Sequence, residues 1–427
     1  MNSKSTCHVI GAGVAGLVAA LRLAQRGRAV MLHEATPVAG GRCRALPDGT
    51  DNGTHALMGA NRAALGFLAD IGAREAWVEA EPEGLPVFDM ADGSARRFAA
   101  SPLDWRDPAK RPPGLSAGGM ATLLRLALPI GDRPVAEVMA AHPALYRALI
   151  EPLTVAALNT PGHEASSARL GVVLRRLGWP GAGAVLVARE GLGPDLIAPA
   201  LRALTQAGVT TRFGARLRAM TEAEGRIIAL HFGDDSIALE ARDQVVLALP
   251  PWEVARLIPK LRVPERHAPI LNLHFAHQTA GPVRFIGVLG GLTQWVLVRP
   301  SGVSVTVSAA DAEVEEQAPD LAPRAWAEIR AAAKAFGLPG DWPQAPPAMR
   351  AVKERRATPR HAVGMPPQPP RQVYRNLALA GDWTWPRLPA TIEAAVLSGE
   401  AAAGVFSSRA DSLGGLENTT TSKAVPS

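Results

Sequence analysis

Three glycines near the N-terminus have the spacing of a backbone that binds a pyrophosphate. Gly11, Gly13 and Gly16 follow the apolar residues 7–10 and open a long apolar stretch. The first glycine permits a tight turn, the second lets a phosphate approach the backbone, and the third lets the helix lie close to the strand. Free N–H groups at the start of such a helix bind phosphates, so Ala15 is expected to lie beside them. The pattern predicts a dinucleotide site.

An acidic residue follows at the position expected for a ribose contact. Residues 29–33 are apolar and predict a second strand, which ends at Glu34, 18 residues after Gly16. The Glu34 carboxylate is placed to accept hydrogen bonds from ribose hydroxyls, and Ala35 is expected beside it. A glycine triad alone occurs by chance, but an acid in register within a strand–turn–helix–strand unit is the confirming context.

A second glycine pair narrows the nature of the dinucleotide. Gly40, Gly41 and Arg42 follow shortly after Glu34. This pattern is typical of flavoproteins with two dinucleotide-binding motifs, in which the arginine reaches the pyrophosphate and the glycines pass close to the cofactor. A domain that binds only NAD has no need of it, so the combination favours FAD.

The C-terminal part carries a motif that resembles the second FAD-binding element of such flavoproteins. Gly381 and Asp382 follow the apolar residues 377–380, and a helix is predicted from about residue 389 to 404. The aspartate is expected to bind the ribityl or pyrophosphate region of the cofactor. The helix N-terminus would point at the flavin edge on which negative charge accumulates during reduction. The residues expected there are Ala390, Thr391 and Ile392.

Two further features concern how the cofactor is held. A strand expected at residues 215–220 matches the element whose backbone pairs with adenine, which places that contact at Leu217. The sequence contains two cysteines, Cys7 and Cys43, and neither lies near the C-terminal motif. FAD is therefore expected to be bound non-covalently.

Length and element order predict an intertwined two-domain α/β fold. The 427 residues are two to three times a typical domain, and 47% of them are hydrophobic. We expect a Rossmann-like FAD domain with two dinucleotide-binding motifs and an inserted α+β substrate domain. The first insertion should be mostly helical, and the second should combine a sheet with one helix. The predicted FAD domain comprises residues 1–75, 189–261 and 371–407, the substrate domain residues 76–188 and 262–370, and a disordered tail residues 408–427.

Composition excludes several partners. The net charge of +6 is spread over isolated arginines, which argues against a nucleic-acid site. No histidine or cysteine spacing is typical of a metal site. Two cysteines without a disulfide framework predict a reducing, cytoplasmic location. No stretch reaches the roughly 18 uncharged apolar residues of a membrane span, so contact with the inner face of the cytoplasmic membrane would be peripheral. The sequence predicts no oligomeric state.

Three segments carry a closer resemblance. They are Asp51–His55, Glu151–Pro161, and Ala380–Thr384 together with Leu388–Glu393. The chain resembles the monoamine oxidase and phytoene desaturase superfamily over about residues 7–405, and within it the hydroxysqualene dehydroxylases of hopanoid and triterpene biosynthesis. Thr54 departs from that pattern, in which glutamine is expected.

The resemblance implies a reaction. Hydroxysqualene, a long apolar isoprenoid alcohol, would become squalene and water as reduced flavin delivers hydride from N5 and an acid protonates the allylic hydroxyl. An electron donor, which the sequence does not identify, must reduce the flavin. Candidate acids are Asp51, His55 and Glu151. Each has a competing interpretation: Asp51 as a turn residue, His55 as a core histidine, and Glu151 as a residue on a solvated helix face.

Several alternatives stay open at the level of sequence. An oxidative phytoene or carotenoid-type desaturase would use the same cofactor with opposite electron flow, and a non-enzymatic prenyl-lipid-binding protein would keep the fold alone. A flavin amine oxidase is disfavoured because only Tyr146 and Tyr374 could supply tyrosines to an aromatic cage. The apolar segments 120–130 and 144–157 could line a substrate tunnel, contact a bilayer beside Arg111 and Arg125, or simply form core.

Overall fold

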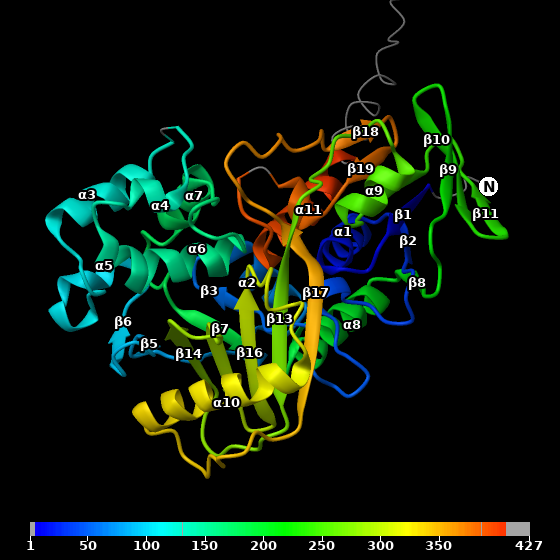
Figure 1. Ribbon diagram of the computed structural model, residues 1–427. Coiled ribbons are helices and arrows are strands. Elements are labelled where there is room, and N and C mark those ends of the chain that lie inside the picture. Colours follow the sequence, from blue (N-terminus) through cyan, green and yellow to red (C-terminus); the bar gives the residue numbers. More distant parts are fainter. Residues whose placement is uncertain (1–4, 130, 386, 407–427) are drawn as a thin grey trace, which may run out of the picture.

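A computed structural model describes residues 5–129, 131–385 and 387–406 (Figure 1). Its first layer is a six-stranded sheet with β1 at its centre, flanked by parallel strands. Parallel strands place their carboxyl ends at one edge of the sheet, which is where ligands bind in folds of this kind. In spatial order the strands are β18 (Gln372–Tyr374), β19 (Leu377–Leu379), β12 (Gln244–Leu247), β1 (Thr6–Ile10), β2 (Ala29–His33) and β8 (Thr210–Arg212).

The first and last long segments of this layer are packed together. Helix α1 (Val14–Gln25) contacts helix α11 (Ile392–Val405) closely. A Cβ at Gly399 of α11 would lie 2.4 Å from the Ala15 carbonyl oxygen and 3.0 Å from Val18 Cβ, so only glycine allows this approach. The N-terminal and C-terminal motifs are thereby brought to the same place. Helices α2 (Arg62–Asp70), α8 (Ala198–Gln206) and α9 (Pro251–Leu257) complete the layer.

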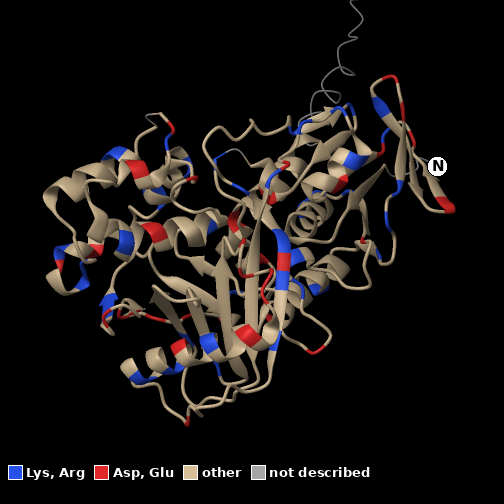
Figure 2. Cartoon of the chain, in the orientation of Figure 1, with Lys and Arg blue, Asp and Glu red and all other residues tan. Residues whose placement is uncertain are grey.

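The second layer is a seven-stranded sheet covered on one face by α10 (Ala318–Ala335), as Figure 1 shows. Leu321, Ala325, Trp326 and Ile329 of α10 are buried against it. Figure 2 shows many charged residues on the edge strand β17 and few on its neighbours. In spatial order the strands are β17 (Met349–Pro359), β13 (His267–Phe275), β16 (Gly302–Ser308), β15 (Trp295–Arg299), β14 (Arg284–Leu289), β5 (Leu85–Asp89) and β6 (Ala95–Phe98).

A helical group lies beside this sheet (Figure 1). Its longest element runs without interruption from α5 through a π-helical turn into α6. None of the helices in the described ranges is long and apolar enough to cross a bilayer. The group comprises α3 (Ala117–Leu126), α4 (Val135–Val138), α5 (Pro143–Leu145), the π turn (Tyr146–Ile150), α6 (Glu151–Leu158) and α7 (Ser167–Arg176).

The remaining strands form two small sheets. One joins β3 (Ala56–Met58), β7 (Val185–Ala188) and β4 (Trp77–Glu79), and the other is the hairpin unit β9 (Ala219–Ala223), β10 (Arg226–Phe232) and β11 (Asp235–Ala238).

Some expected elements are corrected. The strand expected at residues 215–220 begins only at Ala219, because Ala215 N–H donates to the Glu34 carbonyl and Arg218 N–H to that of His231, so the chain crosses here between two sheets. The first insertion was expected to be mostly helical but also contains β4, β5, β6 and β7. The strands of the six-stranded sheet fall in the ranges predicted for the FAD domain, and those of the seven-stranded sheet in the other ranges. The division into domains stays a prediction, and the predicted tail lies outside the described residues.

The contact between α1 and α11 predicts a stability effect. Gly399→Ala inserts a methyl group against the Ala15 backbone and should lower the free energy of unfolding by about 1 to 3 kcal/mol. Gly404→Ala, later in the same helix, meets no atom within 4 Å and should be neutral or stabilise by up to about 1 kcal/mol. Denaturant unfolding of both variants measures the difference, and equal stabilities would contradict the packing.

Candidate active site

A single cavity of about 1240 Å³ lies between the two layers. Its walls come from the carboxyl edge of the six-stranded sheet, the inner face of the seven-stranded sheet, and α6 with the π turn before it. The volume exceeds the range of about 300 to 1,000 Å³ typical of small-ligand pockets. It has room for a dinucleotide and a second molecule.

The N-terminal glycines form a wall of bare backbone. Gly11 has φ +103°, and a Cβ there would lie 2.4 Å from the Ala248 carbonyl oxygen. A Cβ at Gly16 would lie 1.9 Å from the Gly11 oxygen, so Gly16 serves close packing and does not line the cavity. Gly40 N–H donates to the Ala12 carbonyl at 2.8 Å, which brings the second glycine pair against the first. All other predicted cofactor-binding residues line the cavity.

This wall fits a pyrophosphate. Helix α1 begins at Val14 after the N-cap residue Gly13, and its first turn contains no acidic side chain. The N–H groups of a first helical turn have no partner within the helix and carry partial positive charge, so they bind anions. Gly13 and Gly41 line the cavity, and no Cβ covers the backbone at either position. The residues present therefore fit the pyrophosphate of FAD.

Glu34 and Leu217 lie at the adenosine end of the same cavity. Glu34 accepts hydrogen bonds from Ala12 N–H at 2.7 Å and from Thr36 N–H at 2.9 Å, which fixes its carboxylate beside the glycine turn and next to Ala35. Leu217 is buried, and its carbonyl accepts a hydrogen bond from Arg256 Nη2 at 2.8 Å. That oxygen is already engaged, so an adenine contact at Leu217 would use the backbone N–H.

Arg42 joins the two termini directly. Its guanidinium forms an ion pair with Asp382 at 2.7 Å and also donates to the Ala357 carbonyl of β17. Asp382 is buried and accepts a further hydrogen bond from Trp383 N–H at 3.0 Å. Arg42, Gly381 and Asp382 all line the cavity, so a cofactor held by the first motif also meets the second.

The start of α11 is held by a histidine that sequence reasoning missed. Ala390 N–H donates to His361 Nε2 at 2.8 Å, while the Thr391 hydroxyl caps the helix by accepting from Ala394 N–H at 3.2 Å. Burial, with a smaller effect of Arg169, lowers the pKa of His361 to about 3, so the ring stays a neutral acceptor. Ala390, Thr391 and Ile392 line the cavity beside it. An isolated histidine in a loop gives no sequence signal of this role.

A second missed pair supports the same helix. Glu393, in the first turn of α11, is buried and accepts from Arg176 Nη1 at 2.7 Å and from Ala64 N–H at 2.8 Å. Arg176 of α7 and Glu393 both line the cavity. The position of Glu393 directly after Ile392 was the available signal, but nothing in the sequence identified Arg176 as its partner.

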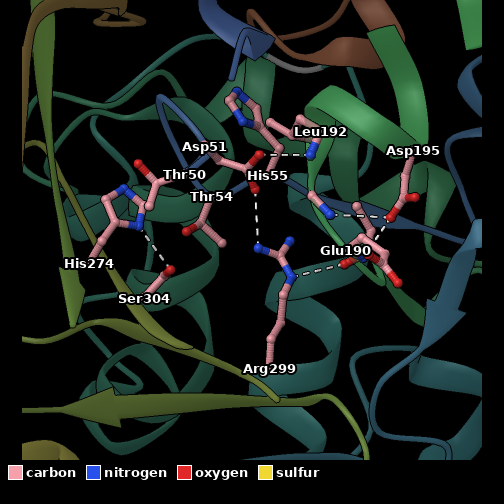
Figure 3. A network of polar contacts seen from close by, with 12 residues as sticks. Thr50, Asp51, Thr54, His55, Glu190, Leu192, Asp195, His274, Arg299 and Ser304 are labelled. Atoms are coloured by element: carbon pink, nitrogen blue, oxygen red, sulfur yellow. Dashed lines mark hydrogen bonds and ion pairs between the residues drawn. The ribbon is translucent and has the colours of Figure 1, made fainter. Parts of the chain in front are cut away.

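Asp51 is placed differently from the other candidate acids (Figure 3). Its carboxylate accepts from Leu192 N–H at 2.7 Å and pairs with Arg299 Nη1 at 3.1 Å. Both side chains are buried, Arg299 also donates from Nε to the Ala188 carbonyl, and Asp51 does not line the cavity. These contacts tie the 51–55 segment to β15 and to the turn before α8. The geometry supports a positioning role for Asp51 in place of the acid considered from sequence.

His55 lines the cavity as a hydrogen-bonded neutral ring. Its Nδ1 lies 2.9 Å from the Gly53 carbonyl oxygen, so Nδ1 carries the proton and donates it. Burial lowers the pKa of His55 below its ordinary value, against smaller opposing effects that include the Gly53 hydrogen bond. In this tautomer Nε2 is an acceptor, which does not suit a proton donor.

Glu151 also lines the cavity, at the first residue of α6. Its Oε1 accepts a hydrogen bond from the Tyr146 hydroxyl at 3.3 Å. Burial, and then the Glu151 charge, raise the pKa of Tyr146 to about 12, so the phenol stays protonated and continues to donate. Among the three predicted acids, Glu151 alone has a carboxyl group in the cavity lining.

Comparison with known proteins identifies the class. The family described as flavin containing amine oxidoreductase matches residues 14–405. Cyclohexylamine oxidase from Brevibacterium oxydans IH-35A superposes with a TM-score of 0.69 at 14% identity, covering 96% of this chain and 100% of that one. A putrescine oxidase triple mutant superposes with a TM-score of 0.68 at 16% identity, covering 95% and 99%. The chain therefore belongs to the flavin-containing amine oxidoreductase family, and the predicted fold class and FAD cofactor are confirmed.

Similarity within that family is narrower. A hydroxysqualene dehydroxylase from Rhodopseudomonas palustris is 38% identical over 94% of this chain and 98% of its own length. Proteins of the same name from Sinorhizobium fredii and Zymomonas mobilis are 34% and 32% identical, each over 93% of this chain. The resemblance noted from sequence motifs is thereby confirmed over nearly the whole chain.

The Asp51–Arg299 pair predicts a separation of stability from catalysis. Arg299→Met leaves a buried carboxylate uncompensated and should lower the free energy of unfolding by about 3 to 5 kcal/mol. Adding Asp51→Asn should recover part of that loss, as measured by denaturant unfolding. The positioning role would be contradicted if Asp51→Asn alone abolished turnover while leaving stability and flavin binding unchanged.

Proposed function

We propose that the protein catalyses the FAD-dependent reductive dehydroxylation of hydroxysqualene to squalene, a step of hopanoid and triterpene biosynthesis. Relatives of that name align over nearly the full chain. The observation that carries the proposal is that the cofactor cavity continues into an apolar branch between α6 and the seven-stranded sheet. A long isoprenoid needs such a branch, whose lining includes Leu149, Leu153, Phe285, Val288 and Trp295.

The reaction balances with one hydride and one proton. The allylic C–O bond breaks, the hydroxyl leaves with an added proton as water, and hydride takes its place on carbon. Reduced FAD, when bound, supplies the two electrons as hydride and ends oxidised. An electron donor, which we do not identify, must then reduce the flavin again. Because an allylic carbon carries developing positive charge, the apolar lining also serves to exclude water that would recapture it.

Within this scheme Glu151 is the residue proposed to protonate the leaving hydroxyl. One oxygen of its carboxyl group accepts from Tyr146, which leaves Oε2 without a partner among the described residues. General acids of this kind contribute about 10² to 10⁴ in rate. His55 and Asp51 then act by position: His55 shapes the cavity wall through Gly53, and Asp51 anchors the segment that carries it.

Two other functions remain as outcomes of the test. An oxidative desaturase of the phytoene or carotenoid type would use the same cavity with electrons flowing from substrate to flavin. A non-enzymatic prenyl-lipid-binding protein would need no flavin, yet this chain keeps backbone open at Gly11, Gly13 and Gly41. That bare backbone supports the enzyme.

The decisive assay uses anaerobically reduced protein. Mixed with hydroxysqualene, it should reoxidise its flavin and form one squalene per flavin, because hydride transfer and loss of water are coupled. Flavin absorbance and product extraction measure the two quantities. Phytoene and squalene offered to the oxidised protein serve as controls. Reduction of the flavin by phytoene would replace the proposal by an oxidative desaturase, and a protein that cannot be reconstituted with FAD would end it.

Replacement of Glu151 tests the proton donor. Glu151→Gln keeps size and polarity but removes the acid, so kcat should fall by about 10² to 10⁴ while FAD binding stays unchanged. Glu137→Gln is the matched control, because Glu137 is an exposed residue of α4 outside the cavity lining. Single-turnover flavin reoxidation measures the rate. Full activity of Glu151→Gln would transfer the role to another group.

A further inference from the structure

The helical group presents an unusually apolar surface to solvent. Leu124 and Leu128 of and after α3 are 63% and 53% exposed, and Trp179 after α7 is 59% exposed. These are the three most exposed large apolar side chains in the described part of the chain. On α3, Leu123 and Leu126 are buried, so the helix has satisfied its core contacts and its other side still shows leucine.

Direct contacts bring these side chains to one region. Helices α3 and α7 lie against each other, and a Cβ at Gly171 of α7 would be 2.1 Å from the Leu126 carbonyl oxygen. Arg175 donates to the Ala127 carbonyl, one residue before Leu128. The name access face is used here for the exposed residues Leu124, Leu128 and Trp179 with the arginines between them.

The charges of the access face have one sign. Residues 117–129 and 167–183 contain four arginines, and neither segment contains an aspartate or glutamate. A fifth arginine, Arg62 of α2, lies over the Trp179 ring at 5.6 Å. Apolar side chains interspersed with arginines are the composition that inserts into an anionic bilayer surface, because each cation near the headgroups and each buried apolar group adds to binding. The four arginines are Arg125, Arg169, Arg175 and Arg176.

The catalytic cavity reaches the same place from inside. Val173, Arg176 and Leu177 of the α7 region line the cavity, and Trp179 is exposed two residues later. Ala100 also lines it, and the adjacent Ser101 donates its hydroxyl to the Leu177 carbonyl at 3.1 Å. The wall between cavity and access face is thus one turn of α7 and the residues that follow it.

We infer that the access face docks on an anionic lipid surface, so that the isoprenoid passes from the bilayer into the cavity beside the end of α7. The inference rests on the proposed function for the identity of what passes, but the docking itself does not. The occupant is the bilayer, because the face combines apolar side chains with uncompensated arginines, as a headgroup layer requires.

Vesicle flotation tests the docking without substrate. The FAD-loaded protein should float with vesicles of phosphatidylglycerol and phosphatidylcholine and not with phosphatidylcholine alone. Leu124→Ser combined with Leu128→Ser should weaken binding by roughly tenfold or more, and Arg125→Gln by about fivefold. Phe213→Ser combined with Ile228→Ser, at exposed apolar positions elsewhere, is the matched control and should bind like the unchanged protein. Flavin absorbance and thermal unfolding verify that each variant is folded.

The outcomes separate the two proposals. No binding to anionic vesicles, or equal binding by the access-face and control variants, would overturn the docking. A dimer in analytical ultracentrifugation that the leucine variants dissociate would instead assign the face to a second copy of the chain. Turnover of hydroxysqualene in micelles without vesicle binding removes the docking alone. Vesicle binding without turnover in either medium removes the proposed function alone.

Discussion

The whole structure depends on close approach of backbone at places where no side chain could fit. A Cβ at Gly11 or Gly16 would meet carbonyl oxygens at 2.4 and 1.9 Å, and one at Gly399 would meet the Ala15 oxygen at 2.4 Å. These contacts set α1 against β1, β12 and α11. Because the N–H groups at the start of α1 then face a cavity with no side chain in front of them, an anion must complete the site. The pyrophosphate of FAD meets that requirement.

Charge is distributed along the cavity in the way that a flavin reaction on an apolar molecule requires. The cofactor end has engaged ion pairs, of which Arg42–Asp382 joins the two motifs and Arg176–Glu393 supports the start of α11. The branch beyond is mostly apolar, and Glu151 is its candidate source of a proton. The two layers thus divide the task, because the six-stranded sheet holds the cofactor and the seven-stranded sheet with α6 surrounds the isoprenoid.

The cofactor half could be read from sequence because its physical constraints are local. The glycine triad, Glu34, the Gly40–Arg42 segment and the Gly381–Asp382 pair each follow a strand, and strand ends are readable from apolar runs. The substrate half depends on contacts between distant segments. Asp51 finds Arg299, and Ala390 finds His361, through folding that no local pattern records. The edge strand β17 was missed because its charged residues hide the alternation expected of a strand.

One measurement tests the central claim most directly: a crystal structure of the protein with FAD and a non-reactive hydroxysqualene analogue. The account predicts the pyrophosphate at the start of α1, the isoalloxazine ring beside residues 381–391, and the isoprenoid chain between α6 and the seven-stranded sheet. A flavin bound elsewhere, or a ring position filled by protein side chains with the analogue outside the cavity, would contradict it.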